Sequence, residues 1–398
     1  MGVSVELETV EAVVIGAGQA GLSTAYHLRR RGLVPYRDFV VLDADAGPGG
    51  AWQHRPPTLT MAMVHGFHQL PYAPLPDFTP EQAARDVLPG YFAAYERDNE
   101  VPVLRPVRVS SVGEADDGSG RLLIATESAT EGGTEGGTRG WLTRTLVNAT
   151  GTWTRPFVPR YPGAERFRGR MLHSSAYGGP EEFAGKRVVV VGGGASAIQI
   201  LAETAAVAET LWVTRRPPVF REERFAPELG RAAVSMVEQR VRAGLPPTSV
   251  VSVTGLPPSP ALLRARELGA LNRLPMFDRI TEHGVVWADA GSDRPSGSDG
   301  HEEPVDAIVW ATGFRAAVGH LTPLGLREPG GGIRMAGTQA AADPRVHLVG
   351  YGPSASTIGA NRAGREAAVA IDRYLHEHPR ESSLAGQVLA DQVLARAR

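Results

Sequence analysis

Two glycine-rich turns contain the residue types and spacings in this sequence that most directly predict chemistry. The first turn, residues 16–21, reads Gly-Ala-Gly-Gln-Ala-Gly; an apolar run precedes it and a helix-like segment follows. In such a GxGxxG turn, the first glycine bends the chain tightly, the second lets a pyrophosphate approach, and the third packs helix against strand. The helix start then offers N–H groups to phosphate oxygens. We therefore expect a dinucleotide to bind at Gly16, Gly18, Gln19, Ala20 and Gly21.

The segment after this turn adds two further candidates. The next apolar strand ends at Asp43-Ala44, and a carboxylate at that place accepts hydrogen bonds from ribose hydroxyls. Small residues at Gly50 and Ala51 would let the backbone lie along a bulky ligand, and Trp52 would cover it. The simpler alternative for Trp52 is core packing.

A second turn, residues 192–197, repeats the pattern as Gly-Gly-Gly-Ala-Ser-Ala, with a final alanine small enough for the packing role. The strand after it ends in Arg215 and Arg216 rather than in an acid. Two guanidinium groups favour a 2′-phosphate and therefore NADPH; a solvated basic turn is the alternative. The predicted contacts of this second turn are Gly192, Gly194, Ala195, Ser196 and Ala197.

The two turns have opposite chemistry beside the ribose, so they require different ligands. The turn followed by an acid suits FAD, and the turn followed by arginines suits NADPH. Hydride would then pass from the nicotinamide to the flavin.

The elements that position these residues alternate between strand and helix. Short β-branched runs at residues 11–15, 39–42, 187–191, 211–213, 306–310 and 346–349 predict buried strands. Helices are predicted at about 20–31, 195–208 and 357–374, and residues 107–146 predict a meander with a polar loop at 129–140. Residues 291–303 predict another polar loop. This order predicts an α/β fold with two Rossmann-like domains.

Composition excludes several classes of function. The 398-residue chain has a formal net charge of −2, which gives no electrostatic case for nucleic acid or an anionic membrane. It has no cysteine, so disulfides, thiolate metal sites and disulfide reductase chemistry are excluded, and we expect no bound metal. Neither a signal peptide nor a membrane-spanning run is evident, which predicts a cytoplasmic protein. The oligomeric state, a homodimer included, stays open.

Taken together, these motifs resemble the class B flavoprotein monooxygenases, which include the flavin-containing monooxygenases, the YUCCA enzymes, N-hydroxylating enzymes and Baeyer–Villiger relatives. Residues 167–177 match the family fingerprint FxGxxxHxxxY, with His173 and Tyr177 at its last two positions. Ala-Thr-Gly turns at Thr150 and Thr312 strengthen the resemblance, which covers most of the chain and implies that both threonines contact the cofactors.

The resemblance implies a reaction and further sites. NADPH would reduce FAD, O₂ would add at flavin C4a to give a hydroperoxide, and a small molecule would be oxidised, with heteroatom oxidation favoured. His173, Tyr177 and Asn361 are the candidate catalytic residues; His173 would equally serve by packing between domains. Gly350, Thr357 and Ile358 are expected near the flavin because a helix N-terminus there would stabilise negative charge. The alternative is that this last helix only packs the domain.

The chain departs from the family pattern where many members have an asparagine near the flavin. The corresponding segment, residues 60–63, reads Thr-Met-Ala-Met, with His65 and His68 nearby as possible replacements or as ordinary loop residues. An NADPH oxidase or flavin reductase, a Baeyer–Villiger enzyme, and a nucleotide-binding sensor or silent partner therefore stay open as alternatives.

The expected domain order is an NADPH domain inserted into an FAD domain. The FAD domain would comprise residues 1–165 and 316–398, and the NADPH domain residues 166–315. The catalytic cleft would lie between them at the carboxyl ends of the strands.

Overall fold

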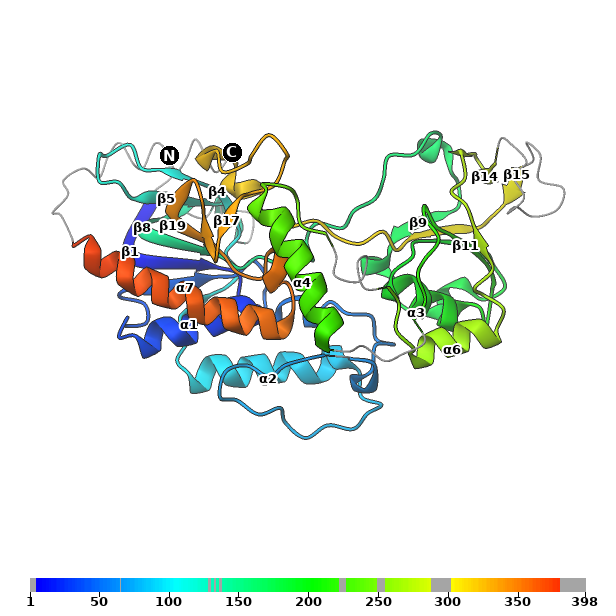
Figure 1. The fold of residues 1–398 in the computed structure, drawn as a ribbon, viewed down its shortest axis with the longest axis horizontal. Coiled ribbons are helices and arrows are strands. Elements are labelled where there is room, and N and C mark those ends of the chain that lie inside the picture. Colours follow the sequence, from blue (N-terminus) through cyan, green and yellow to red (C-terminus); the bar gives the residue numbers. More distant parts are fainter. Residues whose placement is uncertain are drawn as a thin grey trace.

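A computed structural model describes residues 5–64, 66–127, 130–131, 134–135, 138–221, 227–248, 255–287 and 302–379. Two lobes, each built on its own sheet, lie side by side along the long axis of the molecule (Figure 1). In the range predicted as a polar hairpin loop, 129–140, the described residues form an antiparallel pair, β6 (Thr130–Glu131) and β7 (Thr134–Glu135), and the start of β8. Most of the predicted loop at 291–303 lies outside the described residues, as does His65.

The larger lobe is built from both ends of the chain. Its sheet has the strand order β17-β18-β19-β8-β1-β2-β3, and the segment from β19 to β3 is parallel throughout. The central strands contain many buried β-branched residues, as is typical of parallel sheets. Strand β19, from the C-terminal part of the chain, pairs directly with β8. The strands are β1 (Val5–Ile15), β2 (Phe39–Leu42), β3 (Val103–Leu104), β8 (Thr138–Asn148), β17 (Met335–Ala336), β18 (Gln339–Ala340) and β19 (Asp343–Leu348).

Two antiparallel strands extend this sheet from β8. Strand β4 (Val109–Glu114) pairs with β5 (Leu122–Thr126), which pairs with β8. The predicted meander is therefore confirmed, and β8 also forms part of the parallel centre of the sheet.

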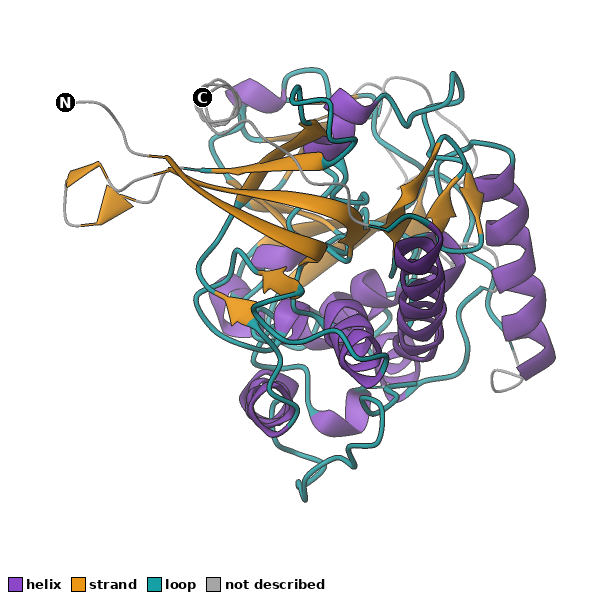
Figure 2. Cartoon of the chain, turned by 90° about the vertical axis from the view of Figure 1, so that its left-hand side faces the viewer, coloured by secondary structure: helices purple, strands orange, loops and turns teal. Residues whose placement is uncertain are grey.

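Helices α1 (Gln19–Arg30), α7 (Thr357–Glu377) and α2 (Ala84–Asp98) lie on one side of this sheet (Figure 1). Helices seen nearly end-on lie below the strands in Figure 2. Helices α1 and α7 pack closely because Gly364 faces Ser23 and Thr24; a Cβ at Gly364 would lie 2.8 Å from Thr24 N. This packing holds the start of α7 beside the first glycine turn.

The smaller lobe has a parallel five-stranded sheet in the order β12-β11-β10-β16-β9. Its strands are β9 (Arg170–His173), β10 (Arg187–Val191), β11 (Glu209–Val213), β12 (Arg273–Leu274) and β16 (Ala307–Trp310). Helices α3 (Ala195–Thr204) and α6 (Pro260–Glu267) contribute to its core, with Trp212 and Val188 buried. A small antiparallel sheet joins β13 (Arg279–Ile280), β14 (Gly284–Val286) and β15 (Glu302–Pro304).

Two of the chain segments that run between the lobes are hydrogen-bonded to each other. Phe157 N donates to Gly313 O at 2.9 Å, and Ala317 N donates to Gly151 O at 3.0 Å. An isolated antiparallel bridge joins Pro156 and Phe314 between them. We call residues 149–157 and 311–317 the two linkers.

Helix α4 (Pro227–Arg242) lies in the sequence range predicted for the NADPH domain, yet it packs on the larger lobe. Its Val241 is buried in a core cluster with Leu348 and Tyr351. Figure 1 shows α4 beside the larger sheet. Among the described residues, no helix has the length and apolar character needed to cross a membrane.

Candidate functional site

The first glycine turn has the three local environments that its sequence predicts. Gly16 has φ +100°, and a Cβ there would lie 2.7 Å from the carbonyl oxygen of Ala149. A Cβ at Gly21 would lie only 1.8 Å from the carbonyl oxygen of Gly16, so this glycine permits the close helix packing. A Cβ at Gly18 meets no atom within 4 Å, which leaves this part of the turn open to a ligand.

The second turn repeats the same arrangement. Gly192 has φ +148°, and a Cβ there would lie 2.2 Å from the carbonyl oxygen of Ala311. Gly194 is open, with no atom within 4 Å of an added Cβ, and Ala197 is fully buried in the packing position. Ala149 and Ala311 each begin an Ala-Thr-Gly segment. Each of these segments therefore lies against the first glycine of one turn.

The helices that follow both turns begin without a side-chain cap. Neither α1 nor α3 has a side-chain hydrogen bond at its N-cap or an acidic residue in its first turn. By contrast, Ser259 caps α6 and Ser356 caps α7 through their side chains. The first-turn N–H groups of α1 and α3 can therefore bind an anionic ligand.

Asp43 lies beside the first turn at the end of β2. Its carboxylate is buried and accepts hydrogen bonds from Ala17 N at 3.3 Å and Asp45 N at 3.2 Å. Burial raises the pKa of this carboxyl, while the Arg105 guanidinium, 3.2 Å away, lowers it. Arg105 is also bound to both oxygens of Glu96 at 2.7 Å. The carboxylate is thereby fixed in orientation, and Ala44 follows it at the surface of the turn.

The loop after β2 lies directly against the first turn. A Cβ at Gly50, which has φ +50°, would lie 2.9 Å from Gly18 Cα. Gly50, Ala51 and Trp52 form one short 3₁₀ turn (Gly50–Trp52), and Trp52 packs edge-to-face with Phe67 at 5.4 Å between ring centroids. Trp52 is half-buried, so it packs against Phe67 and stays partly exposed.

An arginine that the sequence did not single out lies next to Trp52. The Arg55 guanidinium lies over Trp153, 4.8 Å from its ring centroid, and 5.4 Å from that of Trp52. Its Nε is buried and has no hydrogen-bond partner among the described residues. Burial lowers the pKa of Arg55. The site therefore contains a largely desolvated positive charge held between two indoles.

The start of α7 connects to the first turn through side chains. Gln19 Nε2 donates to Asn361 Oδ1 at 2.8 Å, and Asn361 Nδ2 donates to Gln69 O at 2.8 Å. Thr357 Oγ1 accepts from the backbone N–H of His68 at 2.8 Å and donates to Gly66 O at 2.9 Å. These side chains therefore hold the 66–69 loop against α7.

Two other predicted contacts near the start of α7, Ile358 and Gly350, have different surroundings. Ile358, the second residue of α7, keeps 47% of its surface exposed. Gly350 has φ +75°, and a Cβ there would lie 3.4 Å from the side chain of Ala20. The segment before α7 is thus in contact with the first turn.

The two Ala-Thr-Gly threonines hold the linkers together. Thr150 Oγ1 donates to Ala317 O at 2.6 Å, and Thr312 Oγ1 donates to Phe157 O. Each linker therefore supplies one hydroxyl to the other. Both threonines were predicted as cofactor contacts; besides the bond across the linkers, Thr150 Oγ1 accepts from Asn148 Nδ2 at 3.1 Å.

His173 and Tyr177 of the fingerprint also make structural contacts. His173 Nε2 lies 3.0 Å from Gly313 O, which can only accept, while Nδ1 accepts from Ser175 N at 3.1 Å. His173 is therefore a neutral tautomer, and burial lowers its pKa. The Tyr177 hydroxyl donates to Glu203 Oε2 at 2.9 Å, within the smaller lobe.

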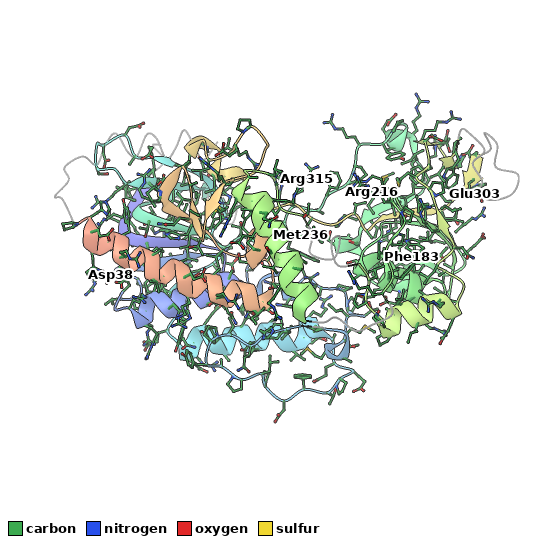
Figure 3. All side chains as sticks on the ribbon, viewed as in Figure 1. Asp38, Phe183, Arg216, Met236, Glu303 and Arg315 are labelled. Atoms are coloured by element: carbon green, nitrogen blue, oxygen red, sulfur yellow. The ribbon has the colours of Figure 1, made fainter. Side chains whose placement is uncertain are left out.

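Arg215 and Arg216 lie immediately beyond the end of β11 and are both exposed. Figure 3 shows Arg216 on the side of the smaller lobe that faces the larger one. The backbone of the second turn is bound to the same strand, since Gly192 N donates to Val213 O at 2.9 Å. The turn and the segment that contains the arginines are thus neighbours.

Comparison with known proteins agrees with this geometry. Residues 13–241, more than half of the chain, match the family model described as pyridine nucleotide-disulphide oxidoreductase. The indole-3-pyruvate monooxygenase YUCCA4 of Oryza sativa subsp. japonica is 30% identical over 341 residues, covering 77% of this chain and 74% of the relative. A Baeyer–Villiger monooxygenase of Streptomyces coelicolor is 31% identical over 243 residues, covering 61% of this chain and 44% of the relative.

Among solved structures, a flavin-containing monooxygenase from Stenotrophomonas maltophilia is 37% identical and superposes with a TM-score of 0.73. The match covers 92% of this chain and 99% of that protein. This chain belongs to the class B flavin monooxygenases. It is an enzyme that uses FAD and NADPH and acts on a small molecule.

The residues of this monooxygenase fit both cofactors. Gly18 and Gly194 leave each turn open, α1 and α3 begin uncapped, and the buried Oε1 of Gln19 lacks a hydrogen-bond partner. No cluster of three or more potential metal-ligating residues occurs in the described ranges. The absence of cysteine excludes the disulfide chemistry that the family model's description includes.

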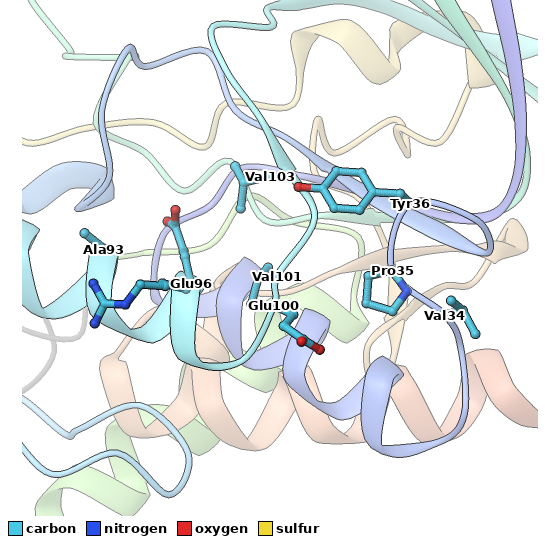
Figure 4. A pocket seen from close by; sticks show the side chains of 9 residues that line it. Val34, Pro35, Tyr36, Ala93, Glu96, Glu100, Val101 and Val103 are labelled. Atoms are coloured by element: carbon cyan, nitrogen blue, oxygen red, sulfur yellow. The ribbon is translucent and has the colours of Figure 1, made fainter.

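Two surface cavities of this monooxygenase lie away from the turns. One, of about 630 Å³, lies at the amino ends of β2 and β3, where Ala93 and Glu96 of α2 lie across from Val34 and Tyr36 (Figure 4). The other, of about 480 Å³, is lined by Arg168, Arg187 and neighbouring residues at the amino ends of the smaller sheet. The glycine turns lie at the opposite, carboxyl ends of the strands.

Proposed function

We propose that this monooxygenase uses NADPH and O₂ to transfer one oxygen atom to a nitrogen or sulfur of a small molecule. The observation that carries the proposal is the pair of matched turns with different neighbours. Asp43 lies at the open turn of the larger lobe, whereas Arg215 and Arg216 lie at the open turn of the smaller lobe. A flavin site and a site for a phosphorylated nicotinamide coenzyme are the combination that such chemistry requires.

In this proposal, the first turn, Asp43, the loop from Gly50 to Trp52 and the start of α7 hold FAD. The second turn with Arg215 and Arg216 holds NADPH. The domain division follows the sheets, with residues 1–165 and 316–398 binding FAD and residues 166–315 binding NADPH, except that α4 packs on the FAD side.

Bound FAD supplies hydride acceptance and oxygen activation, and the protein supplies binding, orientation and exclusion of water. The described contacts of the candidate catalytic side chains support this division of labour. His173 is a neutral donor to a linker carbonyl, Tyr177 donates to Glu203, and Asn361 positions Gln19 and the 66–69 loop. We therefore assign all three as positioning residues.

One observation favours heteroatom oxidation over ketone insertion. The fingerprint ends in Tyr177, as in the flavin-containing monooxygenases that it resembles.

A substrate panel tests this choice. We expect NADPH consumption by the holoenzyme to be coupled to sulfoxide formation from methyl phenyl sulfide, with no lactone from cyclohexanone, and mass spectrometry would measure both products. Lactone without sulfoxide would favour the Baeyer–Villiger alternative. Peroxide equal to the NADPH consumed, whatever substrate is added, would favour the oxidase alternative.

A further inference from the structure

Arg55 lies where the loop beside the first turn meets the two linkers. Its guanidinium lies 4.8 Å from the ring centroid of Trp153, in the first linker, and 5.4 Å from that of Trp52. Trp153 stacks on Phe314 of the second linker, with 5.1 Å between the ring centroids and 24° between the planes. Phe314 meets His173 of the smaller lobe edge-to-face at 4.9 Å. A row of aromatic rings therefore leads from Arg55 to the smaller lobe.

This row of rings lies at the carboxyl ends of both sheets. Trp153 follows Ala149 and Phe314 follows Ala311, and these two alanines lie against the first glycines of the two turns. In open α/β sheets, ligands bind in the crevice outside these strand ends. A ligand bound to Arg55 therefore lies between the two nucleotide turns, where the proposed function requires the substrate.

The positive charge of Arg55 has no counter-charge in the protein. Within the part of the chain that the structure describes, no acidic side chain pairs with Arg55. Asp45, an acid on the same loop, is instead bound by Gln53 and His54, each at 3.1 Å. Burial lowers the pKa of Arg55, and no carboxylate counteracts this effect. A desolvated cation without a counter-charge is costly, so an anion that binds there stabilises the site.

The free donors of Arg55 suit a carboxylate. Arg55 is half-buried, and of its three guanidinium nitrogens only Nε is sealed from solvent without a partner. The two Nη groups are therefore the donors that a ligand can reach. Two parallel N–H donors match the two oxygens of a carboxylate. Because the planar fork is held between Trp52 and Trp153, less rotamer entropy is lost when an anion binds.

The cofactor phosphates have other partners in the proposed function. The uncapped starts of α1 and α3 offer N–H groups to the pyrophosphates, and Arg215 and Arg216 suit the 2′-phosphate. The charge of Arg55 is then left for the substrate. We propose that Arg55 recognises a carboxylate of the substrate, so that this monooxygenase oxidises small organic acids. This inference rests on the proposed oxygen transfer and names the class of molecule that receives the atom.

Two sulfides that differ in charge, para-methylthiobenzoate and its methyl ester, test the inference. We expect calorimetry on the wild-type holoenzyme to show tighter binding of the acid than of the ester. Arg55→Gln removes the cation. It should weaken binding of the acid and raise its KM about 10- to 100-fold, the range expected for hydrogen bonds to a charged group. Binding and turnover of the ester should change little, because the ester has no negative charge.

Two further variants separate recognition from damage to the fold. Arg160→Gln removes an exposed arginine beyond the first linker and should leave the binding of both sulfides unchanged. Arg55→Lys keeps the charge but lacks the paired planar donors, so it should bind the acid with an affinity between those of wild type and Arg55→Gln. If Arg55→Gln does not fold, Arg55→Lys carries the test, with a loss of affinity for the acid alone.

The results distinguish the inference from the proposal beneath it. The inference is wrong if the wild-type enzyme binds the acid no more tightly than the ester. It is also wrong if Arg55→Gln weakens FAD or NADPH binding and keeps the preference for the acid, since the anion would then belong to a cofactor. If calorimetry shows a preference for the acid that Arg55→Gln abolishes, but neither compound yields a sulfoxide, the anion site is supported and the proposed oxygen transfer is wrong.

Discussion

Gly18 and Gly21 lie in the same turn but have opposite surroundings. An added Cβ at Gly18 meets no atom within 4 Å, and its φ of −80° suits any residue. An added Cβ at Gly21 would lie 1.8 Å from a backbone carbonyl oxygen. One glycine leaves room for a ligand, and the other leaves room for the protein's own backbone.

We therefore expect Gly18→Ala to fold with an unchanged melting temperature of the apoprotein but to bind FAD at least about 10-fold more weakly, a loss of about 1.4 kcal/mol. Gly21→Ala should destabilise the fold itself, by about 1–3 kcal/mol or more, because backbone must move. Thermal unfolding and FAD titration measure the two effects.

The matched variant in the second turn is Gly194→Ala, where φ is −105° and no atom lies within 4 Å of an added Cβ. It should raise the KM for NADPH and retain FAD. Equal loss of FAD from Gly18→Ala and Gly194→Ala would show that the turns are not separate cofactor sites.

The central strands could be predicted from sequence with their observed bounds. Strands β2 (Phe39–Leu42) and β10 (Arg187–Val191) are buried apolar runs between turn residues, so local pattern defines them. The glycine turns were predictable for the same reason. Helix α2 was missed because Pro89 lies inside it, and α4 because its apolar face packs on a distant part of the chain.

Two site residues, Arg105 and Arg55, had no usable signal in the sequence. Arg105 acquires its role only when Asp43 of β2 and Glu96 of α2 meet beside it. Arg55 precedes two prolines in a loop, with no periodic pattern to place it between Trp52 and Trp153. Tertiary structure, not local sequence, creates these contacts.

Strand β19 makes the stability of the larger lobe sensitive to acid. His347 is fully buried, and its Nδ1 lies 3.0 Å from Thr338 Oγ1, while Nε2 has no partner among the described residues. Burial lowers its pKa from 6.5 to about 4. The unfolded chain therefore binds a proton between pH 6.5 and 4 that the folded chain does not, and unfolding becomes easier as pH falls through this range.

His347 alone should contribute a loss of about 3 kcal/mol between those limits. We expect the unfolding free energy from urea titration to fall from pH 7 to pH 4, and His347→Gln to flatten that fall. A pH dependence that His347→Gln leaves unaltered would contradict the assignment. His320, whose pKa burial also lowers to about 4, should contribute in the same direction and is the second variant to make.

At the scale of the whole molecule, two lobes with matched turns are joined by two linkers that bond to each other. Thr150 and Thr312 each donate across the linkers, and His173 of the smaller lobe donates to the same segment. The fingerprint histidine and both Ala-Thr-Gly threonines therefore act on the junction. This arrangement supports a division in which the chain positions two cofactors and the cofactors supply the redox chemistry.

Rapid mixing of the NADPH-reduced, anaerobic protein with oxygenated buffer tests the proposed monooxygenase chemistry most directly. The flavin absorbance spectrum is followed with time. We predict a transient near-UV band that differs from those of both oxidised and reduced flavin, and that decays faster when an oxidisable sulfide is present. Direct return to the oxidised spectrum with stoichiometric release of peroxide, with and without the sulfide, would contradict the account.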